Sequence, residues 1–256
     1  MAREGVEIIT GFSSQGYQEY GFRLLDSFDK HGNGHDLIVY THGIKGNVRS
    51  SVRQREQDDI PGLMDLVNKL AEDPRARGEE DFYTSRWKRK EKDAGYSFRF
   101  DAHKFCRMVL TMRDAATLCE TEYMVWIDGD TVITKDIPKG FEKRAMPDGH
   151  DYAYLGRPSK YTETGFLVFR LPEAMPVLDA WANLYLTGAF TDYSEWHSAY
   201  LFDRARESIK DIKGYNITPY GSGHVIHQCW VGSIFDHCKG KRKLRGRSPE
   251  AGKWRR

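Results

Sequence analysis

The sequence has few cysteines and no long apolar run. Its four cysteines, in 256 residues, share no Cys-x-x-Cys spacing, so nothing indicates a disulfide framework or a zinc finger. No stretch approaches the roughly 20 apolar residues of a membrane span. The polar first residues also lack the apolar core of a signal peptide. We therefore expect a reduced protein in the cytoplasm, with no membrane span.

A disordered chain is also excluded for most of the sequence. It contains 14 Tyr, 13 Phe and 6 Trp, far more than segments that stay unfolded. As a single domain, a chain of this length buries about three quarters of its unfolded surface, so it needs no disulfide staples.

The positive and negative charges are distributed unevenly along the chain. The net charge is +2, from 39 basic and 37 acidic residues. Residues 239–256 alone contain nine basic residues and one acidic residue, a charge of +8, which leaves −6 for residues 1–238. A basic end of this kind indicates either contact with a polyanion or a solvated terminus, and the composition leaves both open.

Hydrophobic patterning predicts an α/β protein with a mainly parallel sheet. A strand at 6–10, a helix at 21–30 and an apolar strand at 36–41 form a strand–helix–strand unit within about 40 residues. We expect further helices over 63–70, 101–119, 175–186 and 192–206, further strands over 123–127, 152–155 and 165–169, and short late strands at 217 and 225–226. Residues 73–93 are strongly charged and predict a mobile loop.

Two carboxylates, Asp128 and Asp130, follow the strand predicted at 123–127. Ligands of open α/β sheets bind at this carboxyl end of the strands. Alternate residues of an extended chain point the same way, so both carboxylates can reach one divalent cation. Such a cation keeps open positions for phosphate oxygens. Asp-Gly between two apolar runs is also a hairpin signal, so the motif alone leaves that interpretation open.

A second motif lies near the end of the chain, where His237, Gly240 and Lys243 form a His-x-x-Gly-x-x-Lys pattern. Histidine offers a nitrogen ligand, glycine a close backbone approach and lysine a charge for phosphate. Together with Asp128 and Asp130, this pattern resembles the GT-A glycosyltransferases, especially the glycogenin-like group. The resemblance implies one GT-A domain, Rossmann-like, with a mainly parallel sheet flanked by helices. It also implies a UDP-sugar co-substrate and an Mn²⁺ (or Mg²⁺) ion held by Asp128, Asp130 and His237, with Gly240 and Lys243 at the diphosphate.

The resemblance extends to other nucleotide-binding positions. Thr10 ends the first strand, and Tyr17 and Tyr20 follow it where the family contacts the base. Lys104 resembles the lysine of the family's Thr-Lys-Leu segment, although His103 stands in place of the threonine. Residues 161–169 resemble the family's Asn-Ser-Gly strand, which lines the donor and acceptor pocket.

The chain departs from the family at the catalytic position. Leu244 replaces the proline that follows the last lysine, and the Asp-Gln pair of the catalytic loop is absent. The corresponding region offers Asp192, Glu195 and His197, and Glu163 precedes Gly165 at a strand edge; these are the candidate catalytic residues. Glu163 alternatively pairs with a surface lysine. Glu195 and His197 lie two apart on a predicted helix, so at most one is expected to face the site.

The sequence therefore supports two functions of different classes. The resemblance implies a metal-dependent glycosyltransferase over residues 1–244 that acts with retention, followed by a basic tail at 245–256. The alternative is a non-catalytic DNA-binding protein that uses the tail and the basic cluster at 86–92, although zinc-finger and aromatic RNA-binding signatures are absent. A two-metal nuclease or phosphatase would need several further carboxylates and a lysine near Asp128, and the sequence has no such cluster there. An enzyme that glycosylates hydroxymethylated bases in DNA would combine both functions; glycans and small molecules are the other acceptors.

Overall fold

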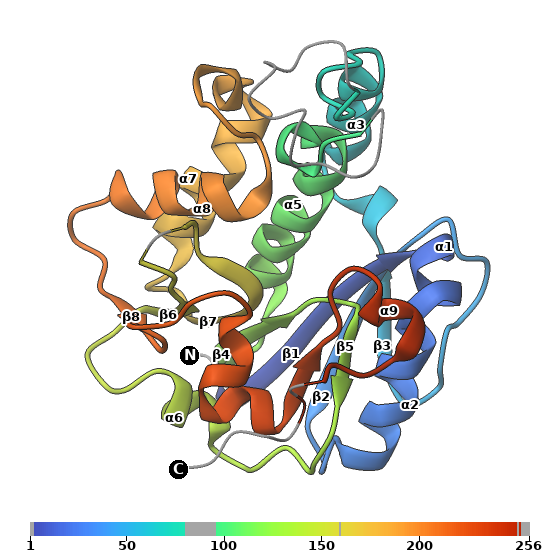
Figure 1. Cartoon of the computed structure of the whole chain (residues 1–256), viewed down its shortest axis with the longest axis vertical. Coiled ribbons are helices and arrows are strands. Elements are labelled where there is room, and N and C mark those ends of the chain that lie inside the picture. Colours follow the sequence, from blue (N-terminus) through green and yellow to red (C-terminus); the bar gives the residue numbers. More distant parts are fainter. Residues whose placement is uncertain (1–2, 80–95, 159, 250, 252–256) are drawn as a thin grey trace.

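The fold centres on a mixed β-sheet. The computed structural model describes residues 3–79, 96–158, 160–249 and 251. The seven strands of the sheet lie in the order β3-β2-β1-β4-β7-β6-β8 (Figure 1). The strands are β1 (Arg3–Ser13), β2 (Asp36–His42), β3 (Arg53–Glu56), β4 (Thr121–Ile127), β6 (Tyr152–Leu155), β7 (Glu163–Arg170) and β8 (Gly214–Asn216). Four neighbouring pairs are parallel, and only β7 runs antiparallel to its two neighbours. The predicted α/β class with a mainly parallel sheet is confirmed.

The first strand–helix–strand unit is as predicted. The helix α2 (Phe22–His31) joins β1 to β2, which pair in parallel with Ile8 opposite Leu37. Adjacent residues of β1 point to opposite faces of the sheet, so Ile8 and Ile9 belong to two separate hydrophobic clusters. Both faces of the sheet are therefore buried, which explains the nearly continuous apolar runs of the central strands.

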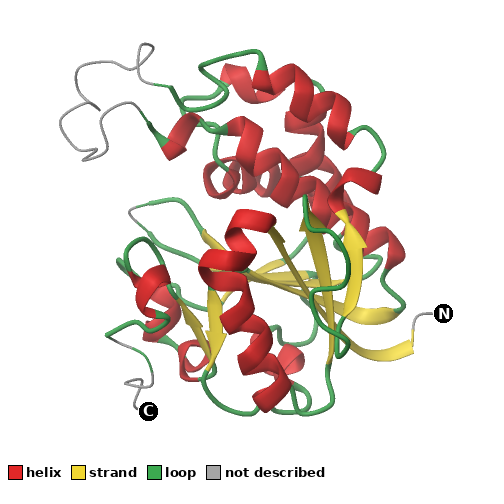
Figure 2. Cartoon of the chain, turned by 90° about the vertical axis from the view of Figure 1, so that its right-hand side faces the viewer, coloured by secondary structure: helices red, strands yellow, loops and turns green. Residues whose placement is uncertain are grey.

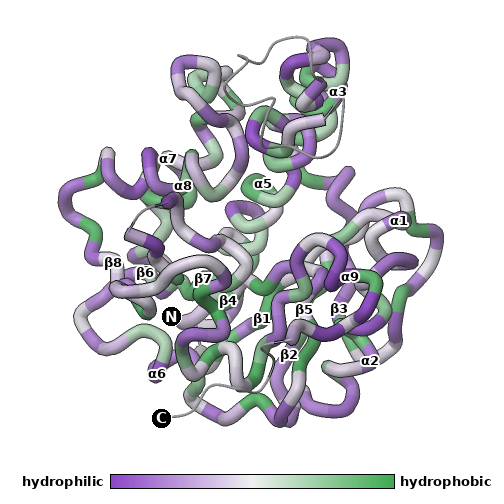
Figure 3. Tube along the Cα trace, in the orientation of Figure 1, coloured by the Kyte–Doolittle hydropathy of each residue, from purple (hydrophilic) through white to green (hydrophobic). Residues whose placement is uncertain are grey.

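Helices cover the two faces unequally. One face packs against α3 (Leu63–Ala71), α5 (Ala102–Leu118), α7 (Met175–Leu186) and α8 (Ser198–Glu207). The other packs against α2, α6 (Phe141–Ala145) and the segment from Val225 to Phe235. Figure 2 shows the larger helical layer on one side of the sheet, and Figure 3 shows the hydrophobic residues gathered along the central strands. None of the described helices combines the length and apolar character that a membrane crossing requires.

The helix prediction is confirmed over α5 and α7 but is wrong at the start of α8. Asp101 caps α5 by accepting a hydrogen bond from the Lys104 amide at 2.9 Å. The helix predicted at 192–206 begins only at Ser198, because His197 is extended and acts as its N-cap. The residues before it form a 3₁₀ turn, η5 (Ala189–Asp192), and an irregular segment.

The late strands were also predicted wrongly. The strand expected at 225–226 is a 3₁₀ turn, η6 (Val225–Gln228), and the strand expected at 217 is β8, which ends one residue earlier. A short strand that was not predicted, β9 (Phe235–His237), pairs antiparallel with β5 (Thr131–Ile133) in a separate two-stranded sheet. Since β4 and β5 belong to different sheets, the Asp-Gly hairpin interpretation is excluded.

The remaining described elements are short. They are α1 (Ser14–Gly16), the π-helical turn η1 (Tyr17–Gly21), the 3₁₀ turns η2 (Gln57–Asp59), η4 (Phe98–Phe100) and η7 (Trp230–Ser233), and α9 (Arg242–Arg245). Part of the stretch predicted as a basic tail contacts the domain, since Ser248 and Ala251 are buried and the Ser248 amide donates to Asp236 at 2.8 Å. Most of the loop predicted at 73–93 lies outside the described residues.

Candidate metal centre

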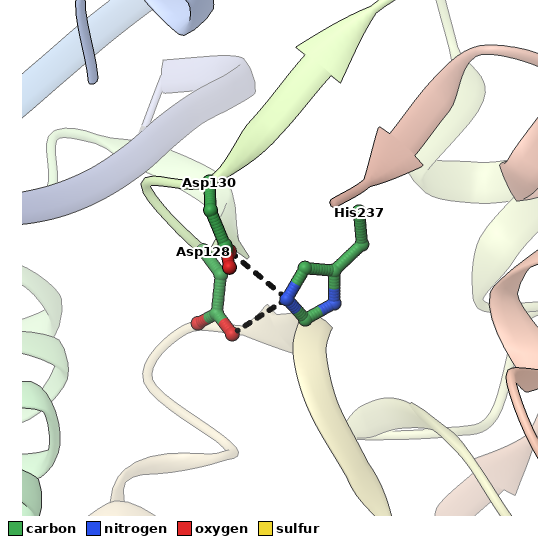
Figure 4. A group of neighbouring side chains, drawn as sticks. All are labelled: Asp128, Asp130 and His237. Carbon is green, nitrogen blue, oxygen red and sulfur yellow. Dashed lines mark ion pairs between the residues drawn. The ribbon is translucent and has the colours of Figure 1, made fainter. Parts of the chain in front are cut away.

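Three side chains from distant parts of the sequence meet at the carboxyl end of β4. His237 Nε2 lies 3.2 Å from an Asp128 oxygen and 3.0 Å from an Asp130 oxygen (Figure 4). The pairing of β5 with β9 places Thr131 opposite His237, and the Cys238 amide donates to the Asp130 carbonyl at 2.9 Å. One ligand atom from each of the three residues lies within 4.8 Å of the other two. We call Asp128, Asp130 and His237 the acidic triad.

The acidic triad has the donors and the spacing that a divalent cation needs. Carboxylate oxygens suit Mg²⁺ and Mn²⁺, and an imidazole nitrogen suits many divalent ions. In octahedral coordination, two neighbouring ligand atoms, each about 2.1 Å from the ion, lie about 3 Å from each other. His237 Nε2 lies at about this distance from an oxygen of each aspartate. The residues therefore fit a divalent cation.

The two carboxylates differ in exposure. The Asp128 side chain is 27% exposed, and the Trp126 indole donates to one of its oxygens at 2.9 Å. Asp130 is buried, and its second oxygen lies 3.0 Å from the Lys243 ammonium. Asp128 therefore faces the surface, while Asp130 forms the inner wall of the triad.

The field around His237 favours positive charge. Burial lowers the pKa of His237, but the charge of Asp130 and the hydrogen bonds to both aspartates outweigh it and raise the pKa to about 10. Burial likewise raises the pKa of Asp130, yet His237 and Lys243 together hold that pKa below its usual range. A site that stabilises a proton on Nε2 is equally suited to a cation bound there.

Glu163 lies behind His237, at the start of β7. Its carboxylate is 2% exposed, and one oxygen lies 3.6 Å from His237 Nδ1. The other oxygen contacts the Lys239 ammonium and lies 3.6 Å from Arg157 Nη1. Burial raises the pKa of Glu163, but the positive groups of Lys239, His237 and Arg157 lower it to about 2. His237 Nδ1 has no hydrogen-bond partner within the described residues, so the ionised carboxylate acts on it by electrostatic attraction, which favours the orientation in which Nε2 faces the triad.

The C-terminal motif also reaches the triad. Gly240, at φ +57°, accepts a hydrogen bond from the Lys243 amide at 3.0 Å in the turn that leads into α9. Arg23 secures this turn by donating to the carbonyls of Lys243 and Leu244 at 2.8 and 3.3 Å. The Lys243 ammonium lies 4.7 Å from the centre of the Tyr20 ring.

Gly165 is a site residue whose role the sequence did not reveal. A Cβ at this position would lie 2.2 Å from His237 Nδ1 and 3.2 Å from an Asp128 oxygen. The Gly165 carbonyl also accepts a hydrogen bond from the Asp128 amide at 3.1 Å. A glycine inside a strand signals a close approach, but the sequence does not say which group approaches.

Other predicted nucleotide-binding and catalytic residues lie outside this contact network. Thr10 is fully buried in β1, Tyr17 stacks on Phe12 with the ring centres 5.7 Å apart, and Lys104 is exposed over the Phe105 ring. Asp192 is exposed at the end of η5. Within the described residues, none of the four predicted residues makes a hydrogen bond or ion pair to the acidic triad.

The prediction that Glu195 and His197 lie on a helix is wrong. We expected them on a helix with only one facing the site, but both precede α8 and hydrogen-bond to each other at 2.9 Å. Glu195 also pairs with Arg99. Burial lowers the pKa of His197 despite the neighbouring Glu195, so its ring is neutral near pH 7. Its ring centre lies 4.3 Å from that of Tyr161.

Comparison with known proteins identifies the fold. No protein-family profile matches the chain, and no curated protein sequence matches it. Among solved structures, the chain is similar to the crystal structure of a glycosyltransferase involved in the glycosylation of the major capsid of PBCV-1. The match covers 94% of this chain and 98% of that one, with a TM-score of 0.53 and 11% sequence identity. The chain therefore has the GT-A glycosyltransferase fold, while membership of the glycogenin-like group stays a prediction.

Proposed function

We propose that this protein is a metal-dependent glycosyltransferase that moves a sugar from a nucleotide-diphosphate donor, a UDP-sugar, to a hydroxyl group. One observation carries the proposal: Asp128, Asp130, His237 and Lys243 converge at the carboxyl edge of a GT-A sheet. Two halves of one cation site, more than a hundred residues apart in the chain, meet where α/β sheets bind their ligands.

The residues of the acidic triad would hold Mn²⁺ or Mg²⁺. When bound, such an ion neutralises the charge that develops on the diphosphate as the glycosidic bond breaks. Lys243 adds a second positive group, since its 31% exposed side chain lies beside Asp130 and can approach a phosphate oxygen. Tyr20 lies under Lys243 and, with Tyr17, is the proposed contact of the nucleotide.

Glu195 and His197 are the proposed acceptor-side pair. The Tyr161 ring that His197 contacts also lies under Arg157, and Arg157 contacts Glu163. The pair is thus connected to the acidic triad through a continuous series of side chains. Asp192 is the weaker candidate because it is exposed. Retention of configuration rests on the glycogenin-like resemblance alone.

DNA with hydroxymethylated bases is a second acceptor candidate, favoured by exposed basic residues beside the site. Lys241, Arg245 and Arg247 are exposed on the segment that carries Lys243. The alternative of a non-catalytic DNA-binding protein predicts steeply salt-dependent binding that survives loss of Asp128 and Asp130.

A transfer assay tests the proposal. The protein is incubated with labelled UDP-sugars and Mn²⁺, and with glucose, glucuronate, glucose 6-phosphate or hydroxymethylated duplex DNA as acceptor. We expect Mn²⁺-dependent label on one acceptor class, lost in Asp130→Asn and kept in Asp136→Asn, since Asp136 pairs with a different histidine, His31, at 2.8 Å. Absence of Mn²⁺-dependent turnover, or full activity in Asp130→Asn, contradicts the proposal.

A further inference from the structure

A cavity of about 420 Å³ opens beside Glu163, between α8 on one side and residues 156–158 and 160–162 on the other. Arg157, Tyr161 and Thr162 form one wall, and Tyr200 and Arg204 of α8 form part of the other. Its volume falls in the range of small-molecule sites. We call it the α8 cavity.

The α8 cavity carries a positive charge that its own acids do not cancel. Four cations line it, Arg157, Lys160, Arg204 and Arg206, against the two acids Asp203 and Glu207. Both acids are already engaged. Asp203 accepts hydrogen bonds from the Thr162 amide and hydroxyl at 2.9 and 2.6 Å and pairs with Arg206 at 2.9 Å, and Glu207 pairs with Arg204 at 2.7 Å. The remaining charge favours an anionic ligand.

Three of these cations are held in place by tyrosine rings. The guanidinium carbons of Arg157, Arg204 and Arg206 lie 4.9, 5.2 and 4.5 Å from the ring centres of Tyr161, Tyr200 and Tyr154 respectively. Stacking fixes the guanidinium planes. Arg157 is held further because it donates to the carbonyls of Tyr161 and Thr162 at 2.9 and 3.3 Å, and Arg206 donates to Asp203 at 2.9 Å. Arg204 Nε is buried and has no hydrogen-bond partner within the described residues. A ligand would therefore meet donors that are already ordered, which lowers the entropic cost of binding.

The α8 cavity also shares a wall with the candidate metal centre. Arg157, which lines the cavity, lies 3.6 Å from Glu163, and Glu163 lies 3.6 Å from His237. A molecule bound in the cavity is thus separated from the acidic triad by the side chains of Arg157 and Glu163. The cavity therefore adjoins the candidate metal centre, where the donor diphosphate is proposed to bind.

We propose that the α8 cavity binds an anionic saccharide, a sugar that carries a phosphate or a carboxylate, as the acceptor of the transfer. The guanidinium groups meet the anion, and the tyrosine rings and polar wall suit a hydroxylated ring. The cavity admits a sugar unit and is too small for an intact DNA duplex. The acceptor role rests on the proposed glycosyltransferase function, whereas binding itself does not.

Calorimetric titration of the metal-free protein tests the binding. The probes are glucose 6-phosphate, glucuronate, glucose and inorganic phosphate. Arg204→Gln removes one cation of the cavity. Its matched control is Arg113→Gln, because Arg113 pairs with Asp179 at the same 2.7 Å and its 44% exposure is close to the 36% of Arg204. We expect both charged sugars to bind and Arg204→Gln to weaken each by about tenfold, with no change in Arg113→Gln.

Glucose, which is neutral, and inorganic phosphate, which lacks a sugar, test whether the cavity requires both a sugar and a negative charge. Glucose and inorganic phosphate should each bind more weakly than glucose 6-phosphate, and saturating UDP with Mn²⁺ should not displace glucose 6-phosphate. The proposal is overturned if neither charged sugar binds, if Arg204→Gln binds them with native affinity, if either simpler probe binds as tightly, or if UDP competes.

The transfer assay separates this proposal from the proposed function. Label transferred to neutral sugars or DNA, with Arg204→Gln unaffected, would overturn the acceptor proposal and leave the transferase function standing. Binding of charged sugars that depends on Arg204, without any transfer, would support the proposal that the cavity binds anionic saccharides. It would contradict the proposed glycosyltransferase function.

Discussion

Glu163 illustrates how a buried carboxylate acts through a neighbouring side chain. It contacts His237 on the side that faces away from the acidic triad. Glu163→Gln keeps the shape and removes the charge, so His237 loses the group that orients it. We predict that Mn²⁺ affinity, measured by electron paramagnetic resonance, falls about ten- to hundredfold. Glu142→Gln, a change at another buried glutamate, should leave that affinity unchanged. Native Mn²⁺ affinity in Glu163→Gln would show that His237 needs no such partner.

Gly165 sets the closest steric limit on the triad. In Gly165→Ala the new Cβ would overlap His237 Nδ1, so the His237 ring must shift from its position beside the aspartates. We predict a loss of Mn²⁺ binding and a decrease of about 1–3 kcal/mol in the free energy of unfolding, measured by denaturant titration.

Gly140→Ala is the control for this change. The added Cβ meets no atom there, but φ is +75°, so we expect a loss of about 1 kcal/mol and unchanged Mn²⁺ binding. If Gly165→Ala behaves in the same way as Gly140→Ala, the steric account of the triad is wrong.

Single elements show which parts of the fold a sequence reveals. The strand–helix–strand unit, α5 and α7 are long enough to display their periodicity, and each was predicted. The three-residue β9 displays none, and its partner β5 lies about a hundred residues away, so only tertiary structure reveals the pairing. The resemblance to the GT-A glycosyltransferases nevertheless implied that Asp128, Asp130 and His237 meet. The helix start at Ser198 was hidden because His197 is an unusual N-cap, and this concealed the contact between Glu195 and His197.

The short helix α9 is positioned by Arg23, which donates to two of its carbonyls. In Arg23→Gln these bonds are lost and Lys243 loses its fixed place beside Asp130. We predict that the free energy of unfolding falls by about 1 kcal/mol and that UDP binds more weakly in the presence of Mn²⁺, as measured by calorimetry. Mn²⁺ affinity alone should persist, because the acidic triad does not depend on Arg23. UDP affinity equal to that of the native protein would contradict the role of α9, and Arg75→Gln serves as the surface control.

The stability of the whole molecule should depend on pH through three histidines, of which His197 is buried and His35 and His103 are half-buried. Burial lowers the pKa of His35, His103 and His197 below the ordinary value of 6.5. Below about pH 6.5 the unfolded chain therefore binds more protons than the folded one, and stability falls as the pH decreases.

His197→Gln should flatten part of this decrease below about pH 6.5, measured as the free energy of unfolding against pH. His150→Gln, the loss of a histidine near the surface, is the comparison. An unchanged slope in His197→Gln would show that His197 is not held neutral by the fold.

The central claim for the whole molecule is that one cation site, formed by Asp128 and Asp130 from the middle of the chain and His237 from near its end, binds a nucleotide diphosphate. Thermal unfolding with UDP and Mn²⁺, separately and together, tests it most directly. With both ligands near 100 times Kd, we predict a rise in Tm of about 5 °C or more, little effect of UDP alone, and no joint effect in Asp130→Asn. Equal stabilisation by UDP without Mn²⁺, or an undiminished joint effect in Asp130→Asn, would contradict the account.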